Sequence, residues 1–168
     1  MISHLVLVFG LFAIASAQRC LDNPPSLPLD VEKFSGTWYA QHRFGRPFVT
    51  PGCFRANCSA TADNGYTALF EYNDGLRQNQ TIYLVFEPKE HNRFLLTFNG
   101  TRILVSYLAV DYDSYAVFYD CVSDVYFSYV LTRSKTRDDA VIERAITEAR
   151  KVQPKLPSPS KELNCDIF

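Results

Sequence analysis

The sequence has little that would point to nucleic acid, a membrane span or a metal ion. Its 168 residues carry 17 Lys and Arg against 18 Asp and Glu, a formal net charge of −1, so no basic excess favours nucleic acid as a partner. No run of about 20 apolar residues follows the N-terminal segment, and we therefore expect no membrane span. Cysteines never occur in CxxC spacing and there are only three histidines, so we expect no metal site.

The N-terminal segment has the pattern of a secretory signal. Residues 5–14 form a short apolar run, and Ala15-Ser16-Ala17 follows it. Such a run before a small-x-small site is typical of a cleaved signal peptide. We therefore expect a signal peptide at 1–17, a single domain at 18–168, and a secreted, extracellular protein.

All five cysteines lie in 18–168, where an oxidising compartment favours disulfides over a metal site. The odd number leaves one thiol unpaired if the others pair within the chain. Three Asn-x-Ser/Thr sequons, at Asn57, Asn79 and Asn99, agree with secretion. An asparagine that carries a glycan must face solvent.

Most of the remaining chain has the pattern of short strands. Between residues 38 and 133, turn sequences separate segments rich in Tyr, Phe, Val, Leu and Thr. Turns that recur about every 8–12 residues indicate an antiparallel sandwich or barrel. Eight strands suit an all-β, up-and-down barrel that encloses one small ligand. The candidate strands are 38–44, 53–61, 66–72, 79–87, 93–98, 102–110, 115–121 and 125–132.

After residue 133 the apolar period changes to that of a helix. Apolar residues recur at helical spacing over 141–152, and charged residues lie on the other side. Thr136 and Asp139 have the spacing of a capping box, and Pro154 is expected to stop the helix. We expect this one C-terminal helix to pack on the outside of the barrel.

Three short motifs occur in a characteristic order. They are FSGTWY at 34–39, which contains G-x-W, LAVDYDSYAV at 108–117, and YVLTRSK at 129–135. In this order, and followed by a helix, they resemble the three signature regions of the lipocalin family over about residues 20–165. Within the family the similarity is to the apolipoprotein D and insect bilin-binding group. The resemblance implies a calyx in which Arg133 stacks on Trp38, beside Gly36, at the closed end of the barrel.

The resemblance also implies two disulfides, Cys20–Cys121 and Cys53–Cys165, and leaves Cys58 over. The sequence leaves four roles open for this thiol. It is inert and buried, it replaces Cys53 as the partner of Cys165, it anchors a bilin covalently through a vinyl group, or it is the nucleophile of an isomerase similar to lipocalin-type prostaglandin D synthase. Because no base besides His42 is evident near it, we expect that the protein is not an enzyme.

Strand alternation predicts which side chains line the cavity. If Asn57 bears a glycan and points outward, its strand neighbours point inward. The same argument applies to Asn79, and Trp38 is assigned an inward orientation. Phe98 and two tyrosines on later strands complete the set, although no anchor fixes the orientation of the tyrosines. The predicted ligand-binding residues are Ala40, His42, Phe44, Ala56, Cys58, Ala60, Ile82, Leu84, Phe86, Phe98, Tyr107 and Tyr119.

The expected function is that of a carrier. One small hydrophobic ligand would enter a preformed pocket, driven by burial of its apolar area. The resemblance favours a bilin such as biliverdin over fatty acids, retinoids or pheromones. We expect a monomer or a weak homo-oligomer whose partner is this small hydrophobic ligand.

Overall fold

The computed structural model describes residues 20, 24–44, 53–73, 79–122, 125–156 and 161–162. The helical elements are α1 (Val31–Phe34), the 3₁₀ turn η1 (Glu90–Asn92) and α2 (Asp139–Val152). The strands are β1 (Gly36–Phe44), β2 (Phe54–Ala60), β3 (Tyr66–Asn73), β4 (Asn79–Lys89), β5 (Arg93–Phe98), β6 (Thr101–Asp111), β7 (Tyr115–Val122), β8 (Val125–Thr132) and β9 (Lys161–Glu162).

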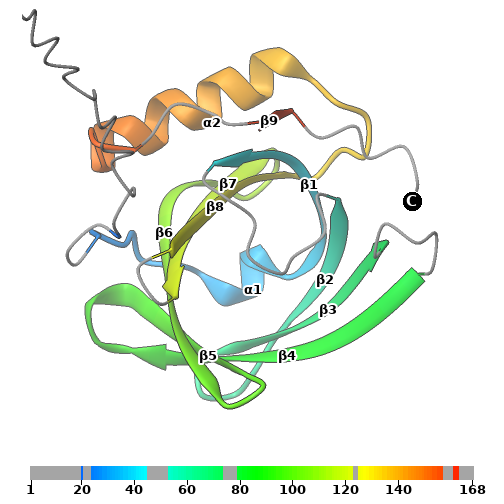
Figure 1. Ribbon diagram of the computed structural model, residues 1–168, viewed down its shortest axis with the longest axis vertical. Helices are drawn as coiled ribbons and strands as arrows, with labels where there is room; N and C mark the ends of the chain where they lie inside the picture. The colour runs from blue at the N-terminus through cyan, green and yellow to red at the C-terminus, as the bar shows by residue number, and fades with distance from the viewer. Residues whose placement is uncertain are drawn as a thin grey trace, which may run out of the picture.

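Strands β1 to β8 form a closed, antiparallel, up-and-down barrel. Each strand pairs with the next, and β1 pairs with both β2 and β8. Figure 1 shows this ring of strands with α2 lying outside it. The short strand β9 adds to β1 beside His42 and Arg43. The predicted eight-stranded barrel with one C-terminal helix on its outside is confirmed.

The short helix α1 closes one end of the barrel. Asp30 caps the helix, because its side chain accepts a hydrogen bond from the N–H of Lys33 at 3.2 Å. Phe34, the last residue of α1, is buried, and its ring centre lies 5.1 Å from that of Trp38. In Figure 1, α1 lies inside the ring of strands. The aromatic side chain of Phe34 therefore forms the floor of the barrel interior.

Arg133, which follows β8, ties α1 to β1 at this closed end. Its guanidinium carbon lies 3.7 Å from the centre of the Trp38 ring. Its side chain donates hydrogen bonds to the carbonyl oxygens of Thr37 at 3.2 Å and Lys33 at 2.9 Å. Gly36 has a φ of +101°, and a Cβ there would stand 3.1 Å from Nη1 of Arg133. Both the backbone and the available space therefore favour glycine at this position.

Helix α2 begins two residues later than a capping box at Thr136 would require. Oδ1 of Asp138 accepts hydrogen bonds from the N–H groups of Ala140 at 2.9 Å and Val141 at 3.3 Å. Asp138 is therefore the N-cap, and the predicted capping box was wrong, because a carboxylate was available closer to the first free N–H groups. The helix ends at Val152, shortly before the proline expected to stop it.

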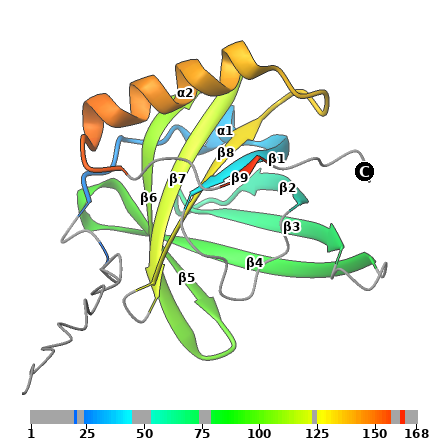
Figure 2. The ribbon, with the colours of Figure 1, turned by 45° about the horizontal axis from the view of Figure 1, so that its top comes forward.

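One face of α2 packs against the barrel. The buried residues of this face are Ile142, Ala145, Ile146 and Ala149. They contact β6, β7 and β8, and Figure 2 shows the helix crossing the outside of these strands. The barrel therefore has a second apolar cluster between its outer face and α2, distinct from its interior. Among the described residues, no helix combines the length and apolar character needed to cross a membrane.

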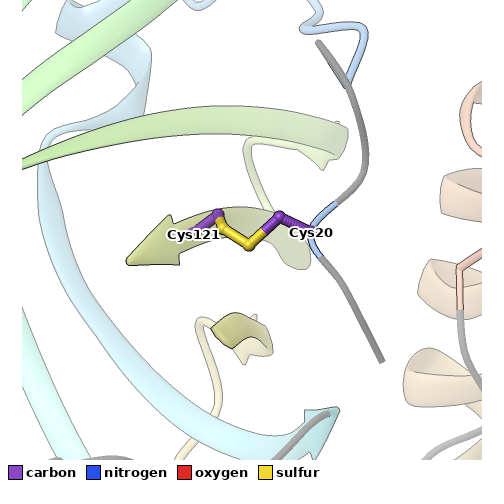
Figure 3. The surroundings of a disulfide bond; sticks show 2 residues. All are labelled: Cys20 and Cys121. Atoms are coloured by element: carbon purple, nitrogen blue, oxygen red, sulfur yellow. A yellow bond between two sulfur atoms is a disulfide. The ribbon is translucent and has the colours of Figure 1, made fainter. Parts of the chain in front are cut away.

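A disulfide joins the N-terminal segment to β7. It links Cys20 and Cys121, whose Cα atoms lie 5.9 Å apart and which are 101 residues apart in sequence (Figure 3). This pairing was predicted and is confirmed. Cys53 is also disulfide-bonded, but Cys165, its expected partner, lies outside the described residues. Cys58 is free, so the alternative in which it pairs in place of Cys53 was wrong.

Candidate functional site

The barrel encloses a cavity of about 450 Å³. The cavity extends from Phe34 on α1 to Asn99 in the hairpin between β5 and β6. Aromatic and aliphatic side chains form most of its wall, and its volume lies within the range of about 300–1,000 Å³ that is usual for small-molecule sites. The interior is therefore a preformed, mainly apolar container with a few polar groups.

Most of the predicted ligand-binding residues border this cavity. They are Ala56, Cys58, Ile82, Leu84, Phe86, Phe98 and Tyr107. Strand alternation succeeds on β2 and β4 because the pairing of both with β3 is regular along its whole length. Asn57 is exposed, as the argument assumed, and Asn99 is exposed at the rim. The side chain of Asn79 lies outside what the structure describes.

Ala40 and Ala60 belong to the barrel core but do not border the cavity. Ala40 is fully buried opposite Leu131, whose larger side chain forms the wall there. The N–H of Ala60 donates a hydrogen bond to Oγ of Ser35 at 3.0 Å, which places Ala60 beside α1 at the closed end. The prediction that Ala40 points into the barrel was correct, but its side chain is too short to reach the cavity.

His42 and Phe44 were predicted to line the cavity and lie instead on the outer side of β1. A β-bulge between Ala40 and His42 interrupts the pairing with β8 and reverses the alternation beyond it. Phe44 is fully buried in the cluster beneath α2, and its ring centre lies 5.5 Å from that of His42. After the bulge, Arg43 pairs with Tyr129, a cavity-lining residue, and so shares its face of the sheet.

Tyr119 was also predicted to line the cavity and faces outward. It is 1% exposed in the cluster beneath α2, and its ring stacks on Tyr126 with centres 6.0 Å apart. Its neighbours Phe118 and Asp120 line the cavity in its place. The disulfide of Cys121 could have revealed this. A bond to the N-terminal segment requires Cys121 to point out of the barrel, and Tyr119 then points out as well.

Two tyrosines form a polar pair near the floor of the cavity. The hydroxyl oxygens of Tyr66 and Tyr107 lie 2.6 Å apart, and both side chains are buried. Burial raises the pKa of both hydroxyls well above the ordinary value, so neither ionises near neutral pH. Because one hydroxyl donates to the other, the second keeps its own hydrogen for an acceptor on a ligand.

Cys58 lies at the closed end of the cavity, in register with Gly36 on β1 and Ala68 on β3. Burial raises the pKa of its thiol to about 12, although the positive charge of Arg133 acts to lower it. At pH 7 about one thiol in 10⁵ is then ionised. Because the thiolate is the reactive form, Cys58 is a weak nucleophile in this setting. His42, the base considered from the sequence, lies on the outer face of β1 and does not assist it.

Asp120 is the polar cavity residue that the sequence analysis missed. Among the described residues that line the cavity, it is the one acidic or basic side chain. Its Oδ1 is buried without a hydrogen-bond partner. Burial raises the pKa of the carboxyl to about 8. The residue as a whole is half-buried because it borders the cavity, and Oδ1 is the buried oxygen of its carboxyl. No group of three or more His, Cys, Asp or Glu in the described part of the chain is placed to hold a metal ion.

An up-and-down barrel closed at one end, with an apolar cavity inside, defines a class of protein that encloses one small molecule. No protein-family profile matches the sequence. Among curated proteins, the chain is 29% identical to apolipoprotein D of Rattus norvegicus over 143 residues, which cover 77% of this chain and 74% of the relative. It is 25% identical to apolipoprotein D of Macaca fascicularis over 181 residues, covering 95% and 93%.

Solved structures share the fold at lower identity. The cockroach allergen Per a 4 matches with a TM-score of 0.66 and 14% identity over 86% of this chain and 94% of that one. Lobster apocrustacyanin A1 matches with a TM-score of 0.62 and 13% identity over the same shares. The solved structures share the barrel fold, and together with the three ordered motifs and the curated relatives they support the resemblance of this chain to the lipocalin family.

Proposed function

We propose that the protein is a secreted lipocalin that binds one small hydrophobic molecule in its barrel and carries or sequesters it. One observation carries the proposal, the enclosed cavity of about 450 Å³ with a mainly apolar wall. Removing apolar ligand area from water contributes about 25 cal/mol per Å². The pocket is already formed, so the binding free energy loses less to ordering of the protein.

Among ligands we favour a bilin, with biliverdin as the named candidate, over fatty acids, retinoids and pheromones. The support is the resemblance to insect bilin-binding proteins together with the chemistry of the wall. Stacked aromatic rings such as Tyr66 and Phe86, with centres 4.3 Å apart, suit a flat conjugated molecule. The Tyr66–Tyr107 pair offers a hydroxyl hydrogen to a carbonyl oxygen of the ligand.

The visible absorption spectrum tests the bilin directly. Biliverdin added to the purified protein should give a band that sharpens, shifts and saturates at one ligand per chain, because the barrel holds the tetrapyrrole in one conformation. If the spectrum remains that of free biliverdin, the bilin is the wrong ligand. Fatty acids, retinoids and pheromones would then be compared by displacement of a neutral apolar dye.

The proposal includes no catalysis and no covalent bond to the ligand. A thiol with a pKa of about 12 supplies too little thiolate to attack an electrophile at a useful rate. We expect Cys58→Ser to keep the ligand affinity of the native protein. We also expect the intact mass after denaturation to show no adduct. Turnover of a lipid peroxide that Cys58→Ser abolishes, with affinity retained, would instead support the isomerase.

Secretion is supported by the Cys20–Cys121 disulfide and by the exposure of Asn57 and Asn99. Expression in a secreting eukaryotic cell tests it. The medium should contain a chain that begins near residue 18 and loses mass on treatment with an N-glycosidase. A chain that stays inside the cell and keeps residues 1–17 would contradict this part of the proposal.

A further inference from the structure

Asp120 belongs to an apolar part of the cavity wall. On β7 it lies opposite Val105 of β6 and Phe127 of β8, and all three residues line the cavity. Neither neighbour has a side-chain donor to offer. A carboxyl on the inner face of a barrel, flanked by hydrocarbon, is therefore available to whatever occupies the cavity.

The protein itself does not satisfy this carboxyl. Oδ1 of Asp120 is buried without a partner, and no side-chain hydrogen bond or ion pair joins Asp120 to another described residue. Burial is the one cause of its raised pKa, so no neighbouring positive charge compensates for its ionisation. Buried polar groups are nearly always paired in folded proteins, and an exception calls for an explanation. A bound ligand supplies one.

The other ionisable groups on the inner face of the barrel come from five strands. Among the described residues they are Arg43 on β1, Cys58 on β2, Tyr66 and Tyr72 on β3, Tyr107 on β6 and Tyr129 on β8. None of them is a second carboxyl or an imidazole. The charge of Asp120 contributes to the raised pKa of both Tyr66 and Tyr107, which places the carboxyl within electrostatic reach of the tyrosine pair. Among these groups, Asp120 is the one carboxyl, and burial raises its pKa to about 8.

We propose that Asp120 accepts a hydrogen bond from nitrogen on the ligand, so that the barrel selects apolar molecules that carry an N–H donor, either an ammonium group or a pyrrole. This inference rests on the proposed function, since it assumes that the barrel binds an apolar molecule. For an ammonium ligand, Asp120 releases its proton to solvent and an ion pair forms inside the cavity. The affinity of such a ligand therefore rises as the pH approaches 8, whereas that of a carboxylate ligand falls.

The test uses displacement of the neutral dye Nile red by probes of equal chain length. Dodecylamine carries the ammonium, dodecanol is the neutral reference, and dodecanoate carries the opposite charge. Biliverdin dimethyl ester presents pyrrole N–H groups without free carboxylates. Each probe is measured at pH 6 and 8.5 with the native protein, with Asp120→Asn, and with Glu87→Gln as the control. Glu87 is exposed on the outside of β4, where it pairs with Lys89.

We expect dodecylamine to bind the native protein about 10-fold more tightly than dodecanol at pH 8.5, in line with a charge-assisted hydrogen bond. Asp120→Asn should remove this preference and leave dodecanol unchanged, while Glu87→Gln alters neither. Loss confined to dodecylamine assigns the ammonium, and loss confined to the ester assigns the pyrrole. Equal affinities in the native protein and Asp120→Asn for both nitrogen probes would overturn the inference. If Nile red itself does not bind the native protein saturably, the proposed function fails as well.

A second measurement needs no variant. The Asp120 carboxyl carbon, followed by NMR in the native protein, should titrate near pH 8 without ligand. With saturating dodecylamine its pKa should fall, because the ammonium stabilises the charged form. An unchanged titration with dodecylamine bound would overturn the ammonium assignment even if Asp120→Asn did not fold.

Discussion

Ionisation of Asp120 should make the folded protein less stable as the pH rises. In the unfolded chain the carboxyl has the ordinary aspartate pKa of 3.8, and in the barrel burial raises the pKa to about 8. Between these two values the folded protein binds the proton more tightly than the unfolded chain does. The free energy of unfolding therefore falls from about pH 4 to about pH 8 and is constant above that, as far as this group is concerned.

The structure bounds the size of the effect. From pH 5 up to the folded-state pKa of about 8, the folded protein keeps a proton that the unfolded chain has lost, over about three pH units. At 1.36 kcal/mol per unit, the free energy of unfolding changes by at most about 4 kcal/mol. Asp120 is half-buried beside the cavity, so water entering from the cavity screens part of its charge. We therefore expect about 2 kcal/mol.

Urea unfolding of the native protein and of Asp120→Asn, at both pH values, measures this contribution. The variant keeps the size of the side chain and removes its ionisation. Relative to the native protein it should gain about 2 kcal/mol between pH 5 and pH 8.5. Carboxylates elsewhere, such as Glu71 beside Arg55, titrate in both proteins and cancel in the difference. A stability difference that is the same at both pH values would refute the assignment of a buried, unpaired carboxyl.

Three other substitutions or treatments test the floor of the barrel. Tyr66→Phe should lower the free energy of unfolding by about 1–2 kcal/mol, because it leaves the Tyr107 hydroxyl buried without its partner; unchanged stability would contradict that hydrogen bond. Cys58 should resist a thiol reagent at pH 7.5 and react once the protein is unfolded in urea; prompt labelling of the native protein would contradict its burial. Arg133→Met should cost about 2–3 kcal/mol and shift the fluorescence of Trp38 to longer wavelength; an unaltered emission spectrum would show that the ring contact matters little.

The barrel and its helix were predictable because their signals are local. Turn sequences separate the strands, and the change from period 2 to period 3.6 after residue 133 marks α2. On β2 and β4, the pairing with β3 is regular, so one residue known to point outward determines the orientation of every other side chain on the strand. For this reason Ala56, Ile82 and Leu84 were placed correctly from sequence.

The bulges were not predictable in the same way. A bulge adds one residue to one strand of a pair, and nothing in the sequence of β1 around residue 41 marks it. Its effect is large, since His42 and Phe44 move from the inner to the outer face while Arg43 moves inward. A second bulge, between Tyr107 and Ala109, has the same effect on β6. Beyond a bulge, the alternation of side chains no longer predicts which residues face inward, unless a second residue of known orientation lies past the bulge.

On β7 the sequence does contain a residue of predictable orientation, Cys121, and it fixes the orientation of its neighbour Asp120. Cys121 must point outward to reach Cys20, which sends Asp120 inward. The odd cysteine drew attention to Cys58 as the reactive group of the pocket. In the structure that thiol is buried at the floor of the cavity, and burial raises its pKa to about 12. The cavity residue with an unpaired polar atom is instead Asp120. It directly precedes Cys121, whose disulfide with Cys20 was predicted from the resemblance.

The most direct test of the central claim is a Nile red titration of two tryptophan variants on adjacent residues of β4. Leu84 lines the cavity, and Val85, 47% exposed, lies on the outer face. Leu84→Trp adds a large ring to the cavity wall and should weaken dye binding, whereas Val85→Trp should bind one dye per chain with the affinity of the native protein. If Leu84→Trp binds the dye as well as the native protein does, the ligand site is not inside the barrel and the account is wrong.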